Sequence, residues 1–221
     1  MDSRILVTDF DGTITRRDFF SRVVDMLLAP GDLAPWHRYE RGELTHFEAL
    51  RQIFARIRAD ETELDAVMGS MEIDPNLRDG FARLADAGWD VIIVSNGCRW
   101  YIDRLLAASG VEATVLSNPG RFDPERGLLM ELPEDSPYFS PETGIDKRAV
   151  VEEHRRRGFD VAFAGDGRPD VDPALLVVPE RRFARAWLAE HLTAEGHRYR
   201  GFDRWSEIAR MLAAPDEEES A

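Results

Sequence analysis

The stretch at residues 5–15, ILVTDFDGTIT, is the feature that most constrains the fold. It opens with an apolar run typical of a buried strand, and Asp9 and Asp11 follow two positions apart. Along an extended strand such residues point the same way, and Gly12 allows the chain to turn directly after them. Two carboxylates, a turn and hydroxyl groups at a strand end suit a cation and a phosphate. The stretch alone also permits an acidic, solvated strand exit without a function.

From residue 74 onward, strand patterns alternate with helix patterns. Apolar runs predict strands at residues 89–94, 113–116, 161–164 and 175–178. Amphipathic stretches predict helices from Asp74 to Gly88 and at residues 99–108, 147–157, 184–195 and 204–212. A hairpin is expected around Gly127. This alternation predicts an α/β, Rossmann-like fold: a parallel sheet with helices on both faces.

Residues 16–74 interrupt this pattern with a helical block. Helices are predicted from about residue 18 to 28, at 45–58 with Thr45 as N-cap, and at 61–71, with no convincing strand between them. The chain is therefore expected to form an α/β core from residues 1–15 and 75–213, with a small helical domain inserted after the first strand. The acidic residues 214–221 are predicted to be a disordered tail.

Composition narrows the possible functions. The chain has 221 residues and a formal charge of −14, which disfavours non-specific binding to nucleic acid because such binding needs a cationic surface. Cys98 is the only cysteine, so an intramolecular disulfide and a cysteine-rich zinc site are excluded. No signal peptide or membrane-length apolar run is present, so we expect a cytoplasmic protein without a membrane partner. The sequence sets no oligomeric state.

Polar residues follow three of the predicted strands. Asp9 and Asp11 follow the first, Ser95 and Asn96 follow the strand at 89–94, and Asp166 follows the strand at 161–164. In open parallel sheets ligands bind beyond the carboxyl ends of the strands. We therefore expect these residues to form one site at that edge.

Four motifs in this chain resemble, in order, those of the haloacid dehalogenase superfamily of phosphohydrolases. They are D-x-D-G-T at residues 9–13, the strand end Val94-Ser95-Asn96-Gly97, Lys147 at a predicted helix start, and G-D-x-x-x-D at residues 165–170. The resemblance implies that Asp9 is the nucleophile, which forms an aspartyl-phosphate, and that Asp11 is the general acid and base. It further implies that Lys147 ties the nucleophile and the phosphate together electrostatically.

The same resemblance implies a substrate and metal set. The residues expected to bind phosphate or substrate are Gly12, Thr13, Ser95, Asn96, Gly97 and Asn118. Those expected to hold Mg²⁺ are Asp9, Asp11 through its backbone carbonyl, Asp166 and Asp170. Asp172 competes with Asp170, although its spacing fits the motif less well, and an aspartate before a helix can also be an N-cap without a metal.

Lys147 is the only lysine among 28 basic residues, which draws attention to it. The alternative is a solvated surface lysine, and Arg148 is the nearby competitor. Cys98 and Arg104 have the C-x5-R spacing of cysteine-dependent phosphatases. Those enzymes bind phosphate in a glycine-rich loop, whereas the residues between Cys98 and Arg104 are bulky and helical. We therefore reject that mechanism.

The position of residues 16–74 matches the small cap of the phosphoserine-phosphatase-like branch. Residues 183–188 and 202–208, with the strand end Ser117-Asn118, resemble the methionine-salvage phosphatases, which act on 2-hydroxy-3-keto-5-methylthiopentenyl-1-phosphate. The resemblance thus implies hydrolysis of a small phosphorylated metabolite, with this compound as the first candidate. The alternative is a phosphoserine phosphatase or another small phosphometabolite phosphatase. A non-enzymatic phosphorylation receiver and a phosphate-binding module also stay open.

For phosphoserine, the cap would need an arginine and an acid to bind the carboxylate and the amine. Arg16, Arg17 and Asp18 are the candidates, and the alternative for them is the solvated start of a helix.

Overall fold

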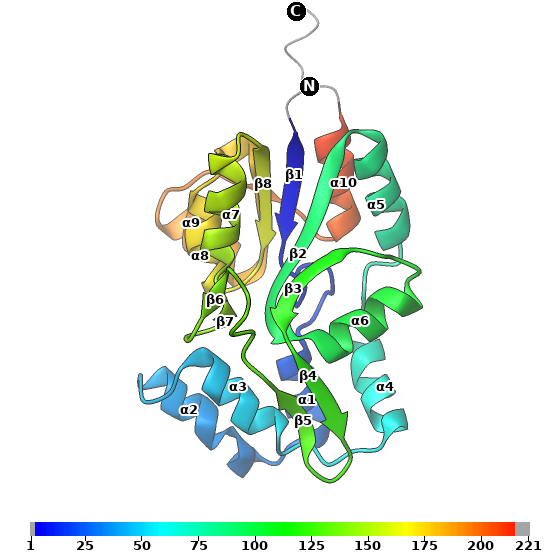
Figure 1. The fold of residues 1–221 in the computed structure, drawn as a ribbon, viewed down its shortest axis with the longest axis vertical. Helices are drawn as coiled ribbons and strands as arrows, with labels where there is room; N and C mark the ends of the chain where they lie inside the picture. The colour runs from blue at the N-terminus through cyan, green and yellow to red at the C-terminus, as the bar shows by residue number, and fades with distance from the viewer. Residues whose placement is uncertain (1–2, 215–221) are drawn as a thin grey trace, which may run out of the picture.

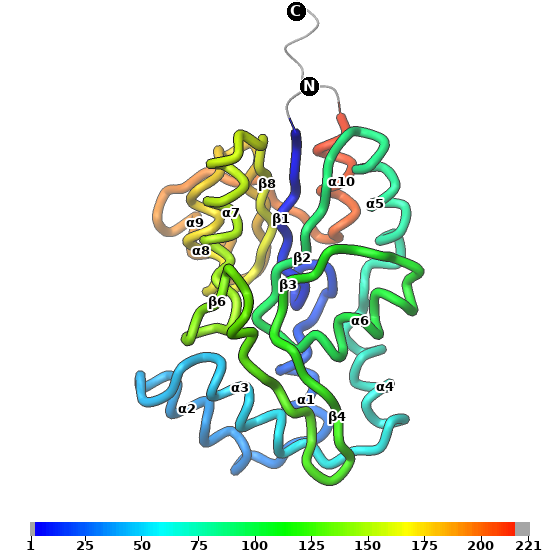
Figure 2. Tube along the Cα trace, in the orientation of Figure 1, coloured from blue at the N-terminus to red at the C-terminus, as the bar shows by residue number. Residues whose placement is uncertain are grey.

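A computed structural model describes residues 3–214, and its fold is shown in Figures 1 and 2. Six parallel strands form the central sheet, in the order β10-β9-β8-β1-β2-β3. They are β1 (Arg4–Thr8), β2 (Trp89–Cys98), β3 (Thr114–Asn118), β8 (Asp160–Gly165), β9 (Arg182–Ala184) and β10 (Arg200–Gly201). The predicted fold class is confirmed.

Helices cover both faces of this sheet because its central strand is apolar on both sides. Successive side chains of a strand point to opposite faces, and Leu6 and Val7 of β1 belong to two separate hydrophobic clusters. The Leu6 cluster includes residues of α5 (Leu77–Asp86), α6 (Arg99–Ala108) and α10 (Trp205–Ala213). The Val7 cluster includes residues of α7 (Lys147–Arg156), α8 (Val171–Leu175) and α9 (Ala186–Ala194). Figure 1 shows α7 to α9 on one side of β1, and α5 and α10 on the other.

The segment between β1 and α5 is helical, as predicted. It contains α1 (Phe19–Leu27), a 3₁₀ turn (Pro30–Leu33), α2 (Ala34–Glu40), α3 (His46–Phe54) and α4 (Glu61–Ser70). In Figure 1 these helices lie beyond the carboxyl ends of the strands. An isolated antiparallel bridge joins Thr15 to Ile73, so the segment leaves and re-enters the α/β part at adjacent positions. The domain boundaries remain a proposal.

Short strands lie outside the main sheet. The predicted hairpin around Gly127 is present as β4 (Gly120–Asp123) and β5 (Gly127–Met130), and β5 lies against α3. A second antiparallel pair, β6 (Phe139–Ser140) and β7 (Gly144–Ile145), leads directly into α7. The β4–β5 hairpin therefore extends from the α/β part to the helical segment. In Figure 2 the hairpin is the green loop beside the blue helices.

The prediction of a strand at residues 175–178 is wrong. Leu175 ends α8, and the sheet strand is instead β9, in a stretch predicted partly as helix. Leu175 and Val178 are 39% and 58% exposed, and this run pairs with no strand of the sheet, although Val177 within it is buried. A short apolar run has no periodicity that separates a strand from other structures.

Several helix boundaries also differ from the prediction. The helix predicted at 45–58 ends at Phe54, and α2 was missed because Pro30 and Gly31 indicated only a break. Helix α5 begins at Leu77, after Asp74. The Asp74 carboxylate instead accepts hydrogen bonds from the backbone N–H groups of Asn76 and Ser206.

One further prediction concerns the C-terminal end of the chain. The predicted acidic tail falls almost wholly on residues 215–221, which lie outside the described residues. The last helix, α10, contacts the first strand: Trp205 Nε1 donates a hydrogen bond of 3.0 Å to Oγ1 of Thr8, the residue directly before Asp9. Among residues 3–214, no helix combines the length and apolarity needed to cross a bilayer.

Candidate active site

The carboxyl ends of β1, β2 and β8 meet at a cavity of about 300 Å³. Asp9 follows β1, Ser95 lies in the irregular end of β2, and Asp166 follows β8. All three line the cavity, together with Lys147 from the start of α7. The sheet edge thus brings together polar residues that lie far apart in the sequence, as its parallel topology requires.

Lys147 joins two carboxylates at the floor of the cavity. Its Nζ lies 2.7 Å from Asp9 Oδ1 and 2.7 Å from Asp170 Oδ1. Asp9 and Lys147 are each 5% exposed. Arg148, the competing basic residue, instead forms an exposed ion pair with Glu152. The site therefore contains Lys147 and not its neighbour.

Burial dominates the electrostatics of this contact. It raises the pKa of Asp9 to about 7, an effect that the charge of Lys147 opposes and the charge of Asp170 reinforces. Burial alone would lower the pKa of Lys147, but the charges of Asp170 and Asp9 outweigh it, so that pKa is raised. Lys147 is therefore a permanent cation beside Asp9.

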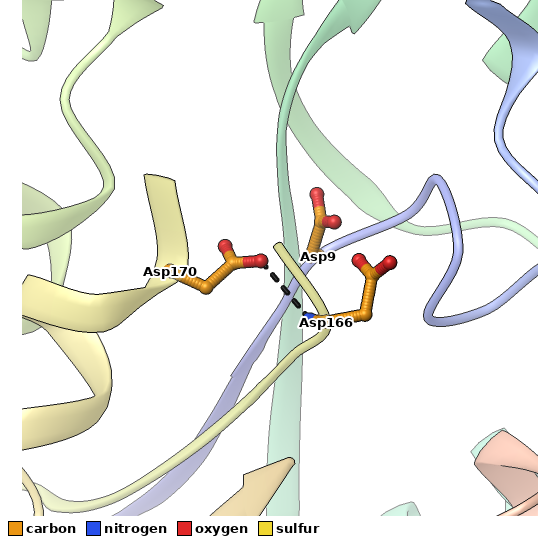
Figure 3. A group of neighbouring side chains, drawn as sticks. All are labelled: Asp9, Asp166 and Asp170. Atoms are coloured by element: carbon orange, nitrogen blue, oxygen red, sulfur yellow. Dashed lines mark hydrogen bonds between the residues drawn. The ribbon is translucent and has the colours of Figure 1, made fainter. Parts of the chain in front are cut away.

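Asp9, Asp166 and Asp170 form an acidic group whose ligand oxygens lie within 4.8 Å of one another (Figure 3). Asp170 Oδ2 accepts hydrogen bonds from the backbone N–H groups of Asp166, at 3.0 Å, and Gly167, at 2.9 Å. Asp170 thus holds the turn that presents Asp166. Asp172 is exposed in the first turn of α8 and is not in the group.

The donor set of this group fits a hard divalent cation. Three carboxylates and one ammonium leave two negative charges uncompensated. Burial, followed by the charges of Asp9 and Asp170, raises the pKa of Asp166 well above its usual range, so the protein alone does not satisfy this carboxylate. Carboxylate oxygens are the ligands that Mg²⁺ prefers.

The Asp11 carboxylate does not belong to the acidic group and is held by other partners. Its Oδ2 accepts a hydrogen bond of 2.6 Å from Tyr101 Oη and one of 3.4 Å from Ser95 Oγ, and its Oδ1 accepts one of 2.9 Å from the Phe19 N–H. Burial raises the pKa of Asp11 to about 6, against the effect of the Tyr101 and Phe19 hydrogen bonds. This carboxylate can therefore exchange a proton near neutral pH.

Gly12 and Thr13, predicted to bind phosphate, pack against Asp166. Gly12 has φ +74°, and a Cβ there would lie 2.1 Å from Asp166 Oδ2, so the position requires glycine. Thr13 Oγ1 donates a hydrogen bond of 3.2 Å to Asp166 Oδ1. Neither residue lines the cavity; both instead orient Asp166.

The strand end Ser95-Asn96-Gly97 does line the cavity. Ser95 Oγ accepts a hydrogen bond of 3.0 Å from the Gly97 N–H, and Asn96 Nδ2 donates one of 2.8 Å to Ile145 O. A Cβ on Gly97 would lie 1.8 Å from Tyr101 Oη, so only glycine allows Tyr101 to reach Asp11.

Asn118 lies behind this strand end. Its Nδ2 donates hydrogen bonds to the carbonyl oxygens of Asn96, at 2.8 Å, and Thr143, at 3.1 Å, and it does not line the cavity. Asn118 therefore stabilises the backbone on either side of the site and does not itself line the cavity.

Comparison with known proteins places this geometry in a family. The sequence model of the haloacid dehalogenase-like hydrolase family matches residues 6–174, which is most of the chain and includes the strand ends described above. The chain belongs to this family. The resemblance seen in the four motifs is therefore confirmed, and with it the prediction of a hydrolase.

Individual relatives of this haloacid dehalogenase-like hydrolase are distant. It is 25% identical to a 2-hydroxy-3-keto-5-methylthiopentenyl-1-phosphate phosphatase of Microcystis aeruginosa, over 97% of this chain and 100% of the relative. It is 26% identical to a phosphatase of the same name from Bacillus pumilus, over 85% of this chain and 81% of that relative. A phosphoserine phosphatase of Idiomarina loihiensis is 30% identical over 34% of each chain.

Solved structures share the fold. A haloacid dehalogenase family hydrolase from Salmonella enterica serovar Typhi has a TM-score of 0.71 at 18% identity, covering 98% of this chain and 72% of that one. A substrate-bound phosphoserine phosphatase has a TM-score of 0.64 at 12% identity, covering 95% of this chain and 98% of that one.

Sequence reasoning missed most of the other residues around the cavity of this hydrolase. They are Phe20, Trp36, His46, Leu50, Phe54, Tyr101 and Pro169. Phe20, Leu50 and Phe54 belong to apolar helix stripes, and periodicity does not distinguish a stripe that packs in a core from one that lines a cavity. Tyr101 lies in the bulky stretch after Cys98, where no sequence signal marks it.

Cys98 itself is fully buried, and burial raises the pKa of its thiol to about 12. Because the thiolate is the nucleophilic form, this environment disfavours nucleophilic attack by Cys98. Arg104 lies over the ring of Trp100, 4.3 Å from its centroid. Both observations agree with the rejection of a cysteine-dependent phosphatase.

Proposed function

We propose that this protein is a Mg²⁺-dependent phosphomonoester hydrolase that acts through an aspartyl-phosphate on Asp9. The observation that carries the proposal is the buried contact between Asp9 and Lys147, at the floor of a cavity that Asp11 also lines. A carboxylate beside a fixed ammonium binds and attacks an electrophilic phosphorus. A second carboxyl that titrates near neutral pH supplies the proton that the leaving group needs.

The reaction has two steps. A carboxylate oxygen of Asp9 attacks phosphorus, the bond from phosphorus to the ester oxygen breaks, and Asp11 gives that oxygen its proton. Asp11 then takes a proton from water, whose oxygen attacks the phosphorus of the aspartyl-phosphate and releases inorganic phosphate, which restores Asp9. Lys147 offsets the negative charge of the phosphoryl group in both steps, and Ser95, Asn96 and Gly97, which line the cavity, are the residues proposed to bind this group.

Asp9 and Asp166 would hold the Mg²⁺, with the Asp11 backbone carbonyl implied as a further ligand by the family resemblance and Asp170 as the third member of the acidic group. When bound, the ion neutralises charge on the phosphoryl oxygens. Because Asp170 also bonds Lys147 and the backbone at residues 166–167, we assign it the support of this group more than direct ligation.

We further propose that residues 16–74 form the cap that recognises the leaving group. The wall that this segment gives the cavity is mainly apolar: Phe20, Trp36, Leu50 and Phe54. Such a wall favours an uncharged leaving group with apolar character. That description fits the methylthio-ketone substrate named for the Microcystis and Bacillus relatives better than it fits phosphoserine.

The placement of the two candidate arginines supports this preference. Arg16 forms an ion pair with Asp203 and Arg17 with Glu72, and neither lines the cavity. Asp18 lines the cavity but caps α1, accepting a hydrogen bond of 2.7 Å from the Ser21 N–H. Among residues 3–214, Lys147 is the only lysine or arginine in the lining.

Turnover tests the proposal. The purified protein should hydrolyse p-nitrophenyl phosphate for many cycles, lose that activity after extensive chelation and regain it with Mg²⁺. A receiver or a phosphate-binding module would not cycle, and full activity after chelation would contradict the metal assignment. A panel of small phosphorylated metabolites should then show a higher kcat/KM for 2-hydroxy-3-keto-5-methylthiopentenyl-1-phosphate than for phosphoserine. A cytoplasmic location is part of the same proposal.

A further inference from the structure

His46 is held rigidly at the boundary between the helical segment and the catalytic floor. It is the first residue of α3, after the N-cap Thr45. The backbone N–H groups of His46 and Phe47 donate hydrogen bonds to Glu142, to Oε1 at 3.1 Å and to the carbonyl oxygen at 2.9 Å. Glu142 lies in the turn between β6 and β7, which leads into Lys147. The backbone that carries the imidazole is therefore tied to the turn that leads into Lys147.

The imidazole lies where two cavities meet. It lines the catalytic cavity and an adjoining cavity of about 720 Å³ whose lining includes Tyr39, Arg168 and Trp187. Trp36 also lines both, and the rings of Trp36 and Tyr39 meet the imidazole edge-on, at centroid distances of 5.9 and 5.4 Å. A leaving group that extends from the phosphate toward the larger cavity would pass this ring.

The imidazole is also unsatisfied. Its Nδ1 is buried and has no hydrogen-bond partner among the described residues. A buried polar atom without a partner costs free energy, and native structures contain few of them. A ligand that offers a hydrogen bond to this ring would recover part of that cost.

The ring is neutral in this environment. Burial, followed by the charge of Lys147, lowers the pKa of His46 to about 4. A neutral imidazole carries one donor and one acceptor nitrogen and no net charge. It suits a hydroxyl or a keto oxygen, whereas a carboxylate would call for a cation.

We propose that His46 determines specificity by forming a hydrogen bond with an uncharged oxygen of the leaving group, close to the phosphoester carbon. The carbon chain of the leaving group then packs against Phe20, Trp36 and Leu50. This inference rests on the proposed phosphatase activity and adds to it the residue that distinguishes an oxygen-bearing leaving group from a purely aliphatic one of the same size.

The test compares two phosphate esters that differ in one oxygen. Hydroxyacetone phosphate carries a keto group next to the phosphoester carbon. Isobutyl phosphate has the same branched shape, with a methyl group in place of the keto oxygen. The kcat/KM of both is measured for the wild type, His46→Phe and His46→Gln. Comparing each ester with itself across the variants removes the difference in their intrinsic reactivity.

His46→Phe keeps the ring and removes the hydrogen bond, so kcat/KM for hydroxyacetone phosphate should fall roughly 5- to 30-fold more than that for isobutyl phosphate. His46→Gln keeps polar hydrogen-bonding groups and should recover part of the loss. His37→Phe is the matched control, because His37 is an exposed histidine of α2 that lines neither cavity. It should leave the ratio between the two esters unchanged.

If His46→Phe lowers kcat/KM equally for both esters, or changes neither value, the ratio between them stays the same. Either result would show that His46 does not recognise the oxygen and would overturn the proposal. If His46→Phe does not fold, comparison of His46→Leu with His46→Gln measures the same ratio. Failure of the proposed function looks different, since the wild type would then hydrolyse neither ester nor p-nitrophenyl phosphate.

Discussion

The cavity has two walls of opposite character. The wall from the sheet edge is charged and closely hydrogen-bonded, with Lys147 joined to Asp9 and Asp170, and Asp170 joined to the backbone at residues 166–167. The wall from the helical segment is mainly apolar, and His46 is its unsatisfied polar side chain. Under the proposed function, the sheet edge carries out the chemistry and the helical segment selects the leaving group, so substitutions in one wall should leave the role of the other intact.

Asp11 connects the catalytic wall to the helical segment. Asp11 of the sheet edge accepts a hydrogen bond from the Phe19 N–H at the start of α1, and another from Tyr101 of α6. Tyr101 is in turn stacked on Phe19, with ring centroids 4.2 Å apart. The proposed acid is thus the residue of the catalytic wall whose position depends on the helical segment.

Substitution of Lys147 should have the largest effect among the variants that leave both aspartates in place. Lys147→Ala removes a cation beside the nucleophile and the phosphoryl group, so kcat/KM on p-nitrophenyl phosphate should fall on the order of 10²-fold or more. Arg148→Ala is the matched control and should stay within about twofold, because its exposed ion pair with Glu152 contributes little. Equal and mild losses in both variants would show that Lys147 does not take part in catalysis.

Loss of the hydrogen bond from Tyr101 to Asp11 should have an intermediate effect on activity. Tyr101→Phe removes the hydroxyl that donates to Asp11, and kcat for an alkyl phosphate should fall roughly tenfold, the scale of one hydrogen bond to a charged group. The loss should be smaller with p-nitrophenyl phosphate, whose leaving group needs less help from a proton. Tyr199→Phe removes an exposed hydroxyl near Thr193 and is the control. Equal losses on both esters would mean that Tyr101 does not act through Asp11.

The smallest effect is expected at the two arginines before α1. Arg16→Ala combined with Arg17→Ala should change kcat/KM for any small phosphomonoester by no more than about twofold, since their exposed ion pairs are the kind that contribute 0–1 kcal/mol. Activity of the double variant on phosphoserine is the informative measurement. A selective loss there would place these arginines at the substrate and favour the phosphoserine alternative.

Most of the catalytic wall could be predicted from the sequence because three of its four motifs join a strand to the residues directly after it. Once the parallel sheet is inferred, Asp9, Ser95 and Asp166 must meet at one edge. Asn118 shows the limit of that reasoning. It follows a strand of the same sheet, yet its amide is directed to the backbone of Asn96 and Thr143.

Neither the contact between Asp11 and Tyr101 nor the cavity lining from the helical segment could be predicted in this way. Asp11 and Tyr101 are 90 residues apart, and their contact depends on Gly97 leaving room for the Tyr101 hydroxyl. The predicted strand at residues 175–178 failed for a related reason, because a short apolar run does not specify its own partners. Periodicity locates helices, but the packing of helices on one another decides which of their residues line a cavity.

The most direct test of the account is to trap the phosphorylated enzyme. Asp11→Asn keeps the nucleophile but removes the group that activates water, so with radiolabelled p-nitrophenyl phosphate the intermediate should form and hydrolyse slowly. Rapid quenching followed by peptide mapping should then place the label on Asp9, and Asp9→Asn should trap no label and have no turnover. Label on Cys98, or near-normal turnover by Asp9→Asn, would contradict the account.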